Sequence, residues 1–255
     1  MNRRFLALLV LVATALLAAC GGGDDEERLT AAPLRAFADG SGIGRMDTLL
    51  FYAPDLAGLV QAVNEGDGSD NGVRLPDDSN MPVVAQYTYA ELRRGVATFE
   101  NQAVNIAVLS DKRTDDLGAA FIELPGAPDI IIIGGEPATD VATAGTHRYT
   151  GTQSASERST LAPGQIGTFT LDVNHSSRTF VFTSQTATFS AAASGSFDAA
   201  TGLFASANVT ITADGRTYVG HLYGQLHGAG ASGTTGIIVT DDFQADYSGA
   251  FIGVR

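Results

Sequence analysis

A single cysteine carries the clearest chemistry in this chain of 255 residues. Cys20 ends the segment Leu17-Ala18-Ala19-Cys20, which has the pattern of a bacterial lipobox. In that pattern a small residue precedes the bond that is cleaved, and the cysteine thiol takes the lipid. Each buried CH₂ group of an acyl chain contributes about 0.8 kcal/mol to membrane attachment, so several chains make a stable anchor. We therefore predict that Cys20 is lipidated, with acyl chains such as palmitate.

The residues around this cysteine predict export. Residues 1–19 begin with a short positive region and continue with the apolar run 5–15, which is too short to span a bilayer comfortably. The alternative is a plain secretory signal with an incidental cysteine. Residues 20–28 then form a glycine-rich, acidic tether. The residue after the cysteine is Gly21, which by analogy with lipoprotein sorting in enteric bacteria favours the outer membrane, at the cell surface or on its periplasmic face.

Histidines are the next candidates for chemistry, because imidazole binds metals and haem iron. His221 and His227 lie six residues apart, near one predicted strand and its end, so they could face the same side. We keep this pair as candidate haem ligands. Solvated or hydrogen-bonded histidines are the alternative, and we expect no tightly bound cofactor.

One acidic loop resembles a calcium-binding loop. Its oxygen-bearing or backbone ligands would come from the first, third, fifth, seventh and twelfth positions, which are Asp67, Ser69, Asn71, Val73 and Asp78. The loop has glycine at its sixth position, as such loops require, but it ends in Asp rather than Glu. An acidic, solvated loop over residues 65–80 is the alternative.

Motifs of the common hydrolytic and nucleotide-dependent enzymes are absent from the sequence. It has no Gly-x-Ser-x-Gly, and Asp39-Gly40-Ser41-Gly42 only shuffles the order of an aspartic-protease motif. Gly134-Gly135 follows a predicted strand but lacks the third glycine and the helix of a phosphate-binding loop. We therefore predict that the protein is not an enzyme.

Composition and charge exclude further classes. With 28 acidic and 15 basic residues the chain is too acidic for a sequence-independent nucleic-acid binder, and its one cysteine excludes an internal disulfide. Residues 20–144 hold 21 of the acidic and 8 of the basic residues, whereas residues 145–255 hold 7 and 5. The acidity therefore belongs mainly to the tether and the first half.

Strict alternation of apolar and polar residues predicts strands throughout residues 145–255. Turn signals such as Ala213-Asp214-Gly215-Arg216 separate the runs. We expect eight antiparallel strands in an up-and-down barrel, with a β-sandwich as the competitor. Small inward residues suit a narrow, filled interior. The eight strands are expected near residues 146–153, 164–174, 178–185, 187–197, 203–213, 216–226, 230–240 and 245–254.

The first half, residues 29–144, is more mixed but still mainly β. Short helices could form at Pro54–Asn64 and Tyr89–Gly95, and the boundary between the halves is expected within 136–144. Strands are expected at Thr48–Tyr52, Val83–Tyr89, Val104–Leu109, Phe121–Leu124 and Ile130–Ile133.

Glycine-based motifs in the second half resemble the barrel domain of transferrin-binding protein B-like surface lipoproteins. The resemblance covers about 110 residues, and each glycine suits a place where a tight barrel admits only a small residue or a bend. The segments that carry it are Gly145–Gly151, Gly167–Asn174, Gly195–Phe197, Gly202–Phe204, Gly220–Gly233 and Ser248–Arg255.

The resemblance implies a division of the chain and a function. Residues 29–144 would be a β-rich handle domain before the barrel of residues 145–255. The protein would be a non-catalytic surface lipoprotein that binds a host protein, haem or a small solute. A Slam-type translocon and a TonB-dependent receptor are the implied partners, besides the membrane itself. The alternatives are an integral outer-membrane barrel and a structural envelope lipoprotein without a small ligand.

Overall fold

The computed structural model describes ten stretches of the chain, and every regular element in them is a β-strand. Among these residues no helix has the length and hydrophobicity that crossing a bilayer requires. The described stretches are residues 48–53, 58–60, 73–74, 81–99, 102–114, 117–123, 130–135, 138–157, 164–240 and 247–255.

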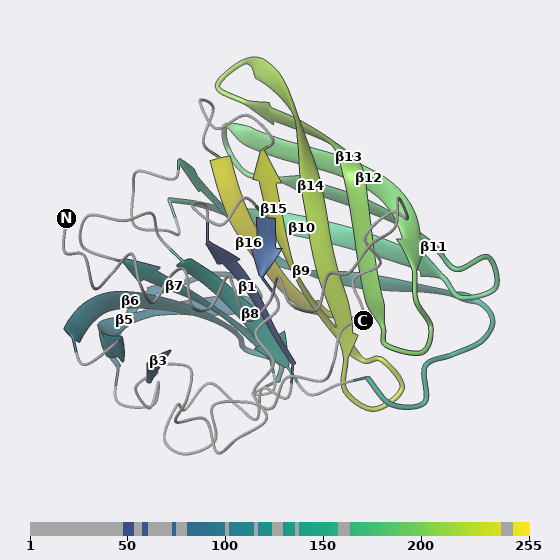
Figure 1. The fold of residues 1–255 in the computed structure, drawn as a ribbon, viewed down its shortest axis with the longest axis horizontal. Helices are drawn as coiled ribbons and strands as arrows, with labels where there is room; N and C mark the ends of the chain where they lie inside the picture. Colours follow the sequence, from purple (N-terminus) through teal and green to yellow (C-terminus); the bar gives the residue numbers. More distant parts are fainter. Residues whose placement is uncertain are drawn as a thin grey trace, which may run out of the picture. The chain divides into compact units, whose positions relative to one another are not determined.

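The second half forms a closed barrel in which each strand pairs with its antiparallel neighbours (Figure 1). This confirms the predicted up-and-down barrel and excludes the sandwich. A two-residue turn joins β13 and β14 at the predicted place, where Ala213 pairs with Arg216. The strands, each close to its expected range, are β9 (Thr146–Glu157), β10 (Gln165–Asn174), β11 (Thr179–Gln185), β12 (Phe189–Phe197), β13 (Leu203–Ala213), β14 (Arg216–His227), β15 (Gly233–Thr240) and β16 (Tyr247–Val254).

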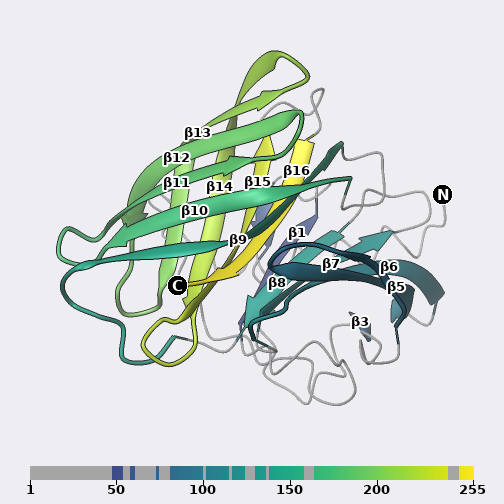
Figure 2. The ribbon, with the colours of Figure 1, turned by 180° about the vertical axis from the view of Figure 1, so that it is seen from behind.

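The first half forms an antiparallel sheet with the order β2-β1-β8-β7-β6-β5-β3 in its described strands, and β4 also pairs with β5 (Figure 2). The expected β-rich character is confirmed. The strands are β1 (Thr48–Ala53), β2 (Gly58–Val60), β3 (Val73–Arg74), β4 (Val83–Gln86), β5 (Ala90–Phe99), β6 (Gln102–Asp111), β7 (Leu117–Glu123) and β8 (Ile130–Gly135).

The two expected helices are wrong wherever the structure describes them. Residues 58–60 are strand β2, and residues 90–95 belong to β5. Ala90 and Leu92 are buried, while the residues between and after them are more exposed, so this segment has the period of a strand. It pairs with β6 over ten residues, and this pairing outweighs a local helical preference.

Phenylalanine rings fill the centre of the barrel, and glycines on neighbouring strands make room for them. Phe251 is fully buried, and its ring lies 4.9 Å from that of Phe169 and 4.8 Å from that of Phe182, between centroids. Several of these rings lie across from a glycine, where a Cβ would come within 2.8 Å of a ring atom. The cross-strand pairs are Phe169–Gly151, Phe180–Gly195, Phe204–Gly224 and Phe251–Gly236.

Strands β15 and β16 are buried on both faces. Their inward residues belong to the barrel core, whereas Ile237 and Ile252 form a second core with the first sheet, including Ile133 of β8 and Phe121 of β7. Sheet and barrel belong to one compact unit of the chain. The division into two domains at residue 145 therefore stays a prediction.

Candidate functional site

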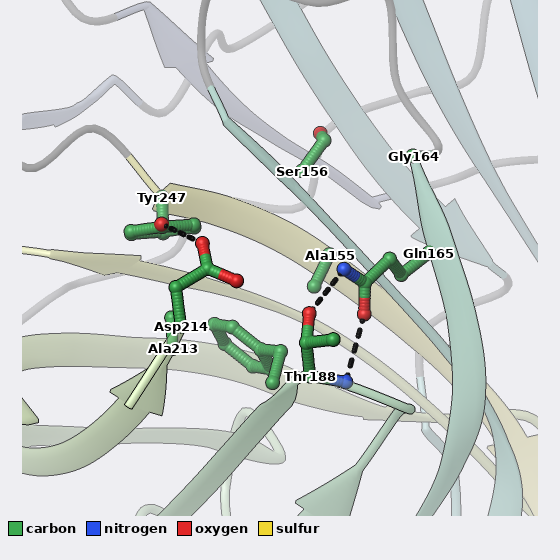
Figure 3. Close-up of a pocket in the computed structure, with 9 residues that line it drawn as sticks. Ala155, Ser156, Gly164, Gln165, Thr188, Ala213, Asp214 and Tyr247 are labelled. Atoms are coloured by element: carbon green, nitrogen blue, oxygen red, sulfur yellow. Dashed lines mark hydrogen bonds between the residues drawn. The ribbon is translucent and has the colours of Figure 1, made fainter. Parts of the chain in front are cut away.

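One end of the barrel contains a pocket of about 260 Å³ (Figure 3). It lies where β9 and β13 end and where β10, β12 and β16 begin. Ala155, Phe189 and Ala213, which belong to the barrel core, form part of its wall. The volume is slightly below the range of roughly 300–1,000 Å³ for pockets that hold drug-sized ligands, so the pocket suits a small molecule.

The hairpin between β13 and β14 brings a carboxylate to this pocket. Asp214 and Gly215 have φ angles of 49° and 75°, which is the signature of a type I′ turn. The Tyr247 hydroxyl donates a hydrogen bond of 2.5 Å to Oδ2 of Asp214 (Figure 3). The Tyr247 ring lies 5.6 Å from that of Tyr218 and 6.4 Å from that of Phe189, between centroids. The pocket therefore combines one acidic acceptor with aromatic surface.

Gln165 organises the opposite wall of the pocket. Its Oε1 accepts hydrogen bonds from the backbone N–H of Thr188 at 3.1 Å and from the Thr186 hydroxyl at 2.7 Å. Its Nε2 donates to the Thr188 hydroxyl, as Figure 3 shows. The side chain thus ties the start of β10 to the turn between β11 and β12. Because both of its polar atoms are engaged, Gln165 shapes the pocket more than it offers free hydrogen-bonding groups.

The other end of the barrel holds two histidines and the C-terminal arginine. The His147 and His175 rings meet edge to face with centroids 4.7 Å apart, and Nη1 of Arg255 lies 3.0 Å from Nδ1 of His147. His175 is 3% exposed, and neither of its ring nitrogens makes a hydrogen bond. Burial lowers the pKa of His175, and electrostatic interaction with His147 and with Arg255 lowers it further, although the Ala142 backbone acts in the opposite direction.

The segment from Thr139 to Gly145, which precedes β9, lies across this second end and is called the strap below. Thr139 bridges to the loop after β14, where its N–H donates to Gly228 and its carbonyl accepts from Gly230. The Gly145 carbonyl accepts a 2.9 Å hydrogen bond from the His175 N–H. Below the strap, Tyr149 donates a 2.6 Å hydrogen bond to the Ala231 carbonyl, and burial raises its pKa to about 12 despite the opposing charge of Arg255. This end is packed and hydrogen-bonded, as a structural closure requires.

The depressed pKa of His175 predicts that acid destabilises the protein. In the unfolded chain the ring titrates near its ordinary pKa of 6.5. The unfolded state therefore binds the proton more tightly, and the contribution of neutral His175 to stability is lost as the pH falls below this value. Urea unfolding should show a lower midpoint at pH 5.5 than at pH 7.5. His175→Leu should reduce this difference, and an unchanged difference in that variant would assign the acid sensitivity to other groups.

The candidate haem ligands lie on one strand but far apart. His221 and His227 both project from the outer face of β14, because Leu222 and Leu226 between them belong to the barrel core. At about 3.4 Å per residue the two are roughly 20 Å apart, too far to bind one iron atom together. His227 is buried and hydrogen-bonds the Thr235 hydroxyl at 2.7 Å, while the His221 ring stacks with that of Tyr223. Either histidine alone as a haem ligand stays a prediction.

The remaining predicted site residues fall largely outside the described stretches. Cys20 lies outside them, as do four of the five candidate calcium ligands, Asp67, Ser69, Asn71 and Asp78. The fifth, Val73, is in strand β3 and pairs with β5. Within the described stretches, no group of three or more His, Cys, Asp or Glu residues is placed to hold a metal ion.

Sequence reasoning missed the residues that shape the two ends of the barrel. It recognised the turn at Asp214 but not the partner of this carboxylate, Tyr247, which lies 33 residues away. His147 and His175 lie 28 residues apart in the chain, and nothing in that spacing indicates that their rings meet. The usable signal was the predicted barrel itself, whose hairpin order places the start of β9 beside the end of β10.

Comparison with known proteins gives a match in structure alone. No protein-family model matches this sequence, and none of the curated proteins does either. Transferrin-binding protein B from serogroup B Neisseria meningitidis is similar in structure, with a TM-score of 0.55 at 15% identity, over 82% of this chain and 43% of that one. Intact Ap-TbpB, with its N and C lobes, gives a TM-score of 0.52 at 11% identity, over 82% and 46%.

A double mutant of transferrin-binding protein B from Haemophilus parasuis gives a TM-score of 0.51 at 12% identity, over 83% of this chain and 45% of that one. At such identities the likeness concerns the fold. The chain spans less than half the length of each of these three structures. This chain therefore has a transferrin-binding protein B-like fold, as the resemblance in its sequence predicted.

Proposed function

We propose that this protein is a non-catalytic binding protein, held at the outer membrane by lipid on Cys20 and exposed at the cell surface. Its ligand would be a host protein, haem or a small solute. The observation that carries the proposal is the filled barrel, whose centre is occupied by its own phenylalanine rings. A ligand larger than the end pocket must therefore bind on the outside of the barrel, on the sheet or on the loops.

A protein partner fits this arrangement best among the three ligand classes. A large partner can use the outer surfaces and loops that a rigid, packed barrel presents. The similar solved structures support the same class, since they are proteins named for binding transferrin. Under this proposal a TonB-dependent receptor would act beside the protein, and a Slam-type translocon would deliver it to the surface.

The side chains on the inner and outer faces of the barrel favour a lipid-anchored domain over a barrel embedded in the membrane. A barrel in the outer membrane turns its apolar side chains outward to the lipid. In β10 and β11 the apolar residues Phe169 and Phe182 belong to the barrel core. Thr170 and Thr183 lie on the outer face, where their hydroxyls hydrogen-bond each other at 2.8 Å. A polar outer face of this kind suits water rather than lipid.

Replacing Cys20 with alanine is expected to move the protein from the membrane pellet to the aqueous fraction, because the acyl chains would be its attachment. The same change should abolish incorporation of a palmitate analogue supplied to the cells. Protease added to intact cells should digest the wild-type protein. An embedded barrel would stay in the pellet without Cys20, and resistance to external protease would contradict exposure at the surface.

The ligand class is tested with the purified Cys20→Ala protein. Surface plasmon resonance against transferrin measures a protein partner, and titration with haem, followed by the Soret absorbance band, measures the alternative. Saturable capture of transferrin would support a protein partner. A Soret shift that His221→Ala or His227→Ala abolishes would instead favour haem, and binding of neither probe would favour a structural envelope lipoprotein.

A further inference from the structure

His175 is a buried histidine whose ring has no hydrogen-bond partner. It lies just after β10, is 3% exposed, and neither Nδ1 nor Nε2 makes a hydrogen bond. The ring packs against those of His147 and Phe197, at centroid distances of 4.7 and 5.3 Å. A protonated ring carries a charge and two N–H donors, and burying a charge without a counter-ion is costly. This position therefore favours the neutral ring.

The charged groups that face this ring from the surrounding elements also oppose its protonation. His147 faces it from β9, Arg255 follows β16, and interaction with each of them disfavours the charged ring. Strand β12 presents the apolar ring of Phe197, and in the strap the backbone of Ala142 favours the charged ring, but burial is the largest effect. The other charged residues at this end of the barrel are not among the groups that act on its charge: Asp140, Arg148, Asp172, Arg178 and Asp198.

The contact between His147 and Arg255 adds a second proton-sensitive element. Nη1 of Arg255 lies 3.0 Å from Nδ1 of His147, and because arginine can only donate, Nδ1 is the acceptor of a neutral ring. A protonated His147 would carry a hydrogen on Nδ1, which would meet the arginine donor instead of accepting from it. Acid therefore turns an attraction into a repulsion. We call His147, His175 and Arg255 the histidine cluster.

The strap rests on this cluster and has few other attachments to the barrel end. The Gly145 carbonyl accepts from the His175 N–H at 2.9 Å, and the Gly145 N–H donates to the Ser176 hydroxyl at 3.3 Å. At the far end of the strap, Thr139 makes two backbone hydrogen bonds with the loop after β14. Between these points Val141 packs against the barrel core. A segment with so few bonds opens more easily than strands such as β9 and β10, which pair over ten residues.

Two residues of this junction have a strained backbone. Asp140 in the strap and Ala231 in the loop bridged by Thr139 have φ angles of 54° and 57°. The Cβ of an L-residue makes this left-handed region unfavourable. Detachment of the strap would release the strain at Asp140, so the closed strap depends on its contacts with the barrel end.

We propose that the strap is an acid-sensitive closure, which detaches from the barrel end when the histidine cluster is protonated while the eight strands stay paired. Detachment would let water reach the His175 ring, satisfy its new N–H donors and separate it from Arg255. It would also uncover the apolar contact between Val141 and the core. This device is independent of the lipid anchor and of the ligand in the proposed function.

Hydrogen–deuterium exchange of the full chain, purified in detergent, measures the strap directly. After correction for the intrinsic pH dependence of exchange, protection of residues 139–145 and 228–231 should fall about tenfold between pH 7.5 and pH 5.5. This factor is expected because the His175 ring titrates near its ordinary pKa of 6.5 when the strap is open and stays neutral when it is closed. Strands β10 to β13 should keep their protection at both pH values.

His175→Leu should hold the strap closed at both pH values, because it removes the titrating ring and keeps an apolar side chain beside Phe197. His221→Leu removes a histidine from the outer face of β14 and is the matched control. The strap of this control should lose protection in acid as the wild-type strap does.

Three results would overturn the proposal. The first is equal corrected protection of the strap at both pH values, and the second is a loss in His175→Leu as large as in wild type. The third is a simultaneous loss of protection in all barrel strands at pH 5.5, which would show global unfolding instead. If His175→Leu fails to fold, NMR titration of the wild-type rings replaces it, and proton uptake by His175 under a fully protected strap would contradict the proposal.

Discussion

Phe251→Ala is expected to lower the free energy of unfolding by about 4 kcal/mol, because it empties the centre of the barrel core. The Phe251 ring is fully buried and packs against those of Phe169 and Phe182, with Phe204 at 6.4 Å. Across from it Gly236 has no side chain with which to fill the gap. Urea unfolding, followed by circular dichroism, measures the change.

Val181→Ala is the control for this substitution. Val181 is 54% exposed on the outer face of β11, so its truncation should change stability by less than about 0.5 kcal/mol. If Phe251→Ala lowered the free energy of unfolding by less than about 1 kcal/mol, this result would contradict a filled barrel core. The proposal that large ligands bind on the outside would then lose its structural basis as well.

Arg113→Ala is expected to lower the free energy of unfolding by about 3 kcal/mol, because it leaves the buried carboxylate of Asp111 without its counter-charge. The Asp111 side chain is 0% exposed, and the Arg113 guanidinium donates to both of its oxygens, at 2.9 and 2.6 Å. The same guanidinium donates to the Thr150 carbonyl of β9 and lies 4.4 Å from the centre of the Tyr89 ring. Arg113 thus joins the end of β6 to the barrel.

A matched arginine elsewhere tests whether burial is the reason. Arg148 pairs with Asp172 at 2.7 Å, and hydrogen bonding from Arg148 lowers the pKa of that carboxyl, but the Asp172 side chain is 32% exposed, whereas that of Asp111 is 0% exposed. Arg148→Ala should therefore leave stability almost unchanged. Chemical denaturation of both variants provides the comparison. Equal effects would contradict the assignment of Arg113 to a buried ion pair at the junction of sheet and barrel.

Most of the barrel could be predicted because its information is local. Period-2 alternation identifies a strand from its own residues, and Asp214-Gly215 identifies its turn, since few other pairs adopt two positive φ angles in succession. The strands of the first sheet were harder to predict from the sequence. Tyr89–Gly95 suggested a short helix, and only pairing with β6 made it part of a strand, so the decisive contacts were not local.

The candidate site followed the same division. The acidic turn at Asp214 was visible in the sequence, but the Tyr247 hydroxyl that bonds it comes from another strand. His175 looked like any polar residue in a turn. Only its place at the end of the closed barrel shows that its ring is buried and that its nitrogens have no hydrogen-bond partners. Such facts depend on contacts between distant segments, which spacing along one chain does not specify.

The β-rich class, the eight barrel strands and the motif that predicts lipid on Cys20 can all be read from the amino-acid sequence, because each depends on residues close together in the chain. Which faces of the strands meet depends on the tertiary structure. It buried both sides of β15 and β16, placed phenylalanine rings opposite glycines and separated His221 from His227 along one strand. Closure of the barrel fixes an inner and an outer face for all strands at once, and packing of the first sheet then covers the outer faces of β15 and β16.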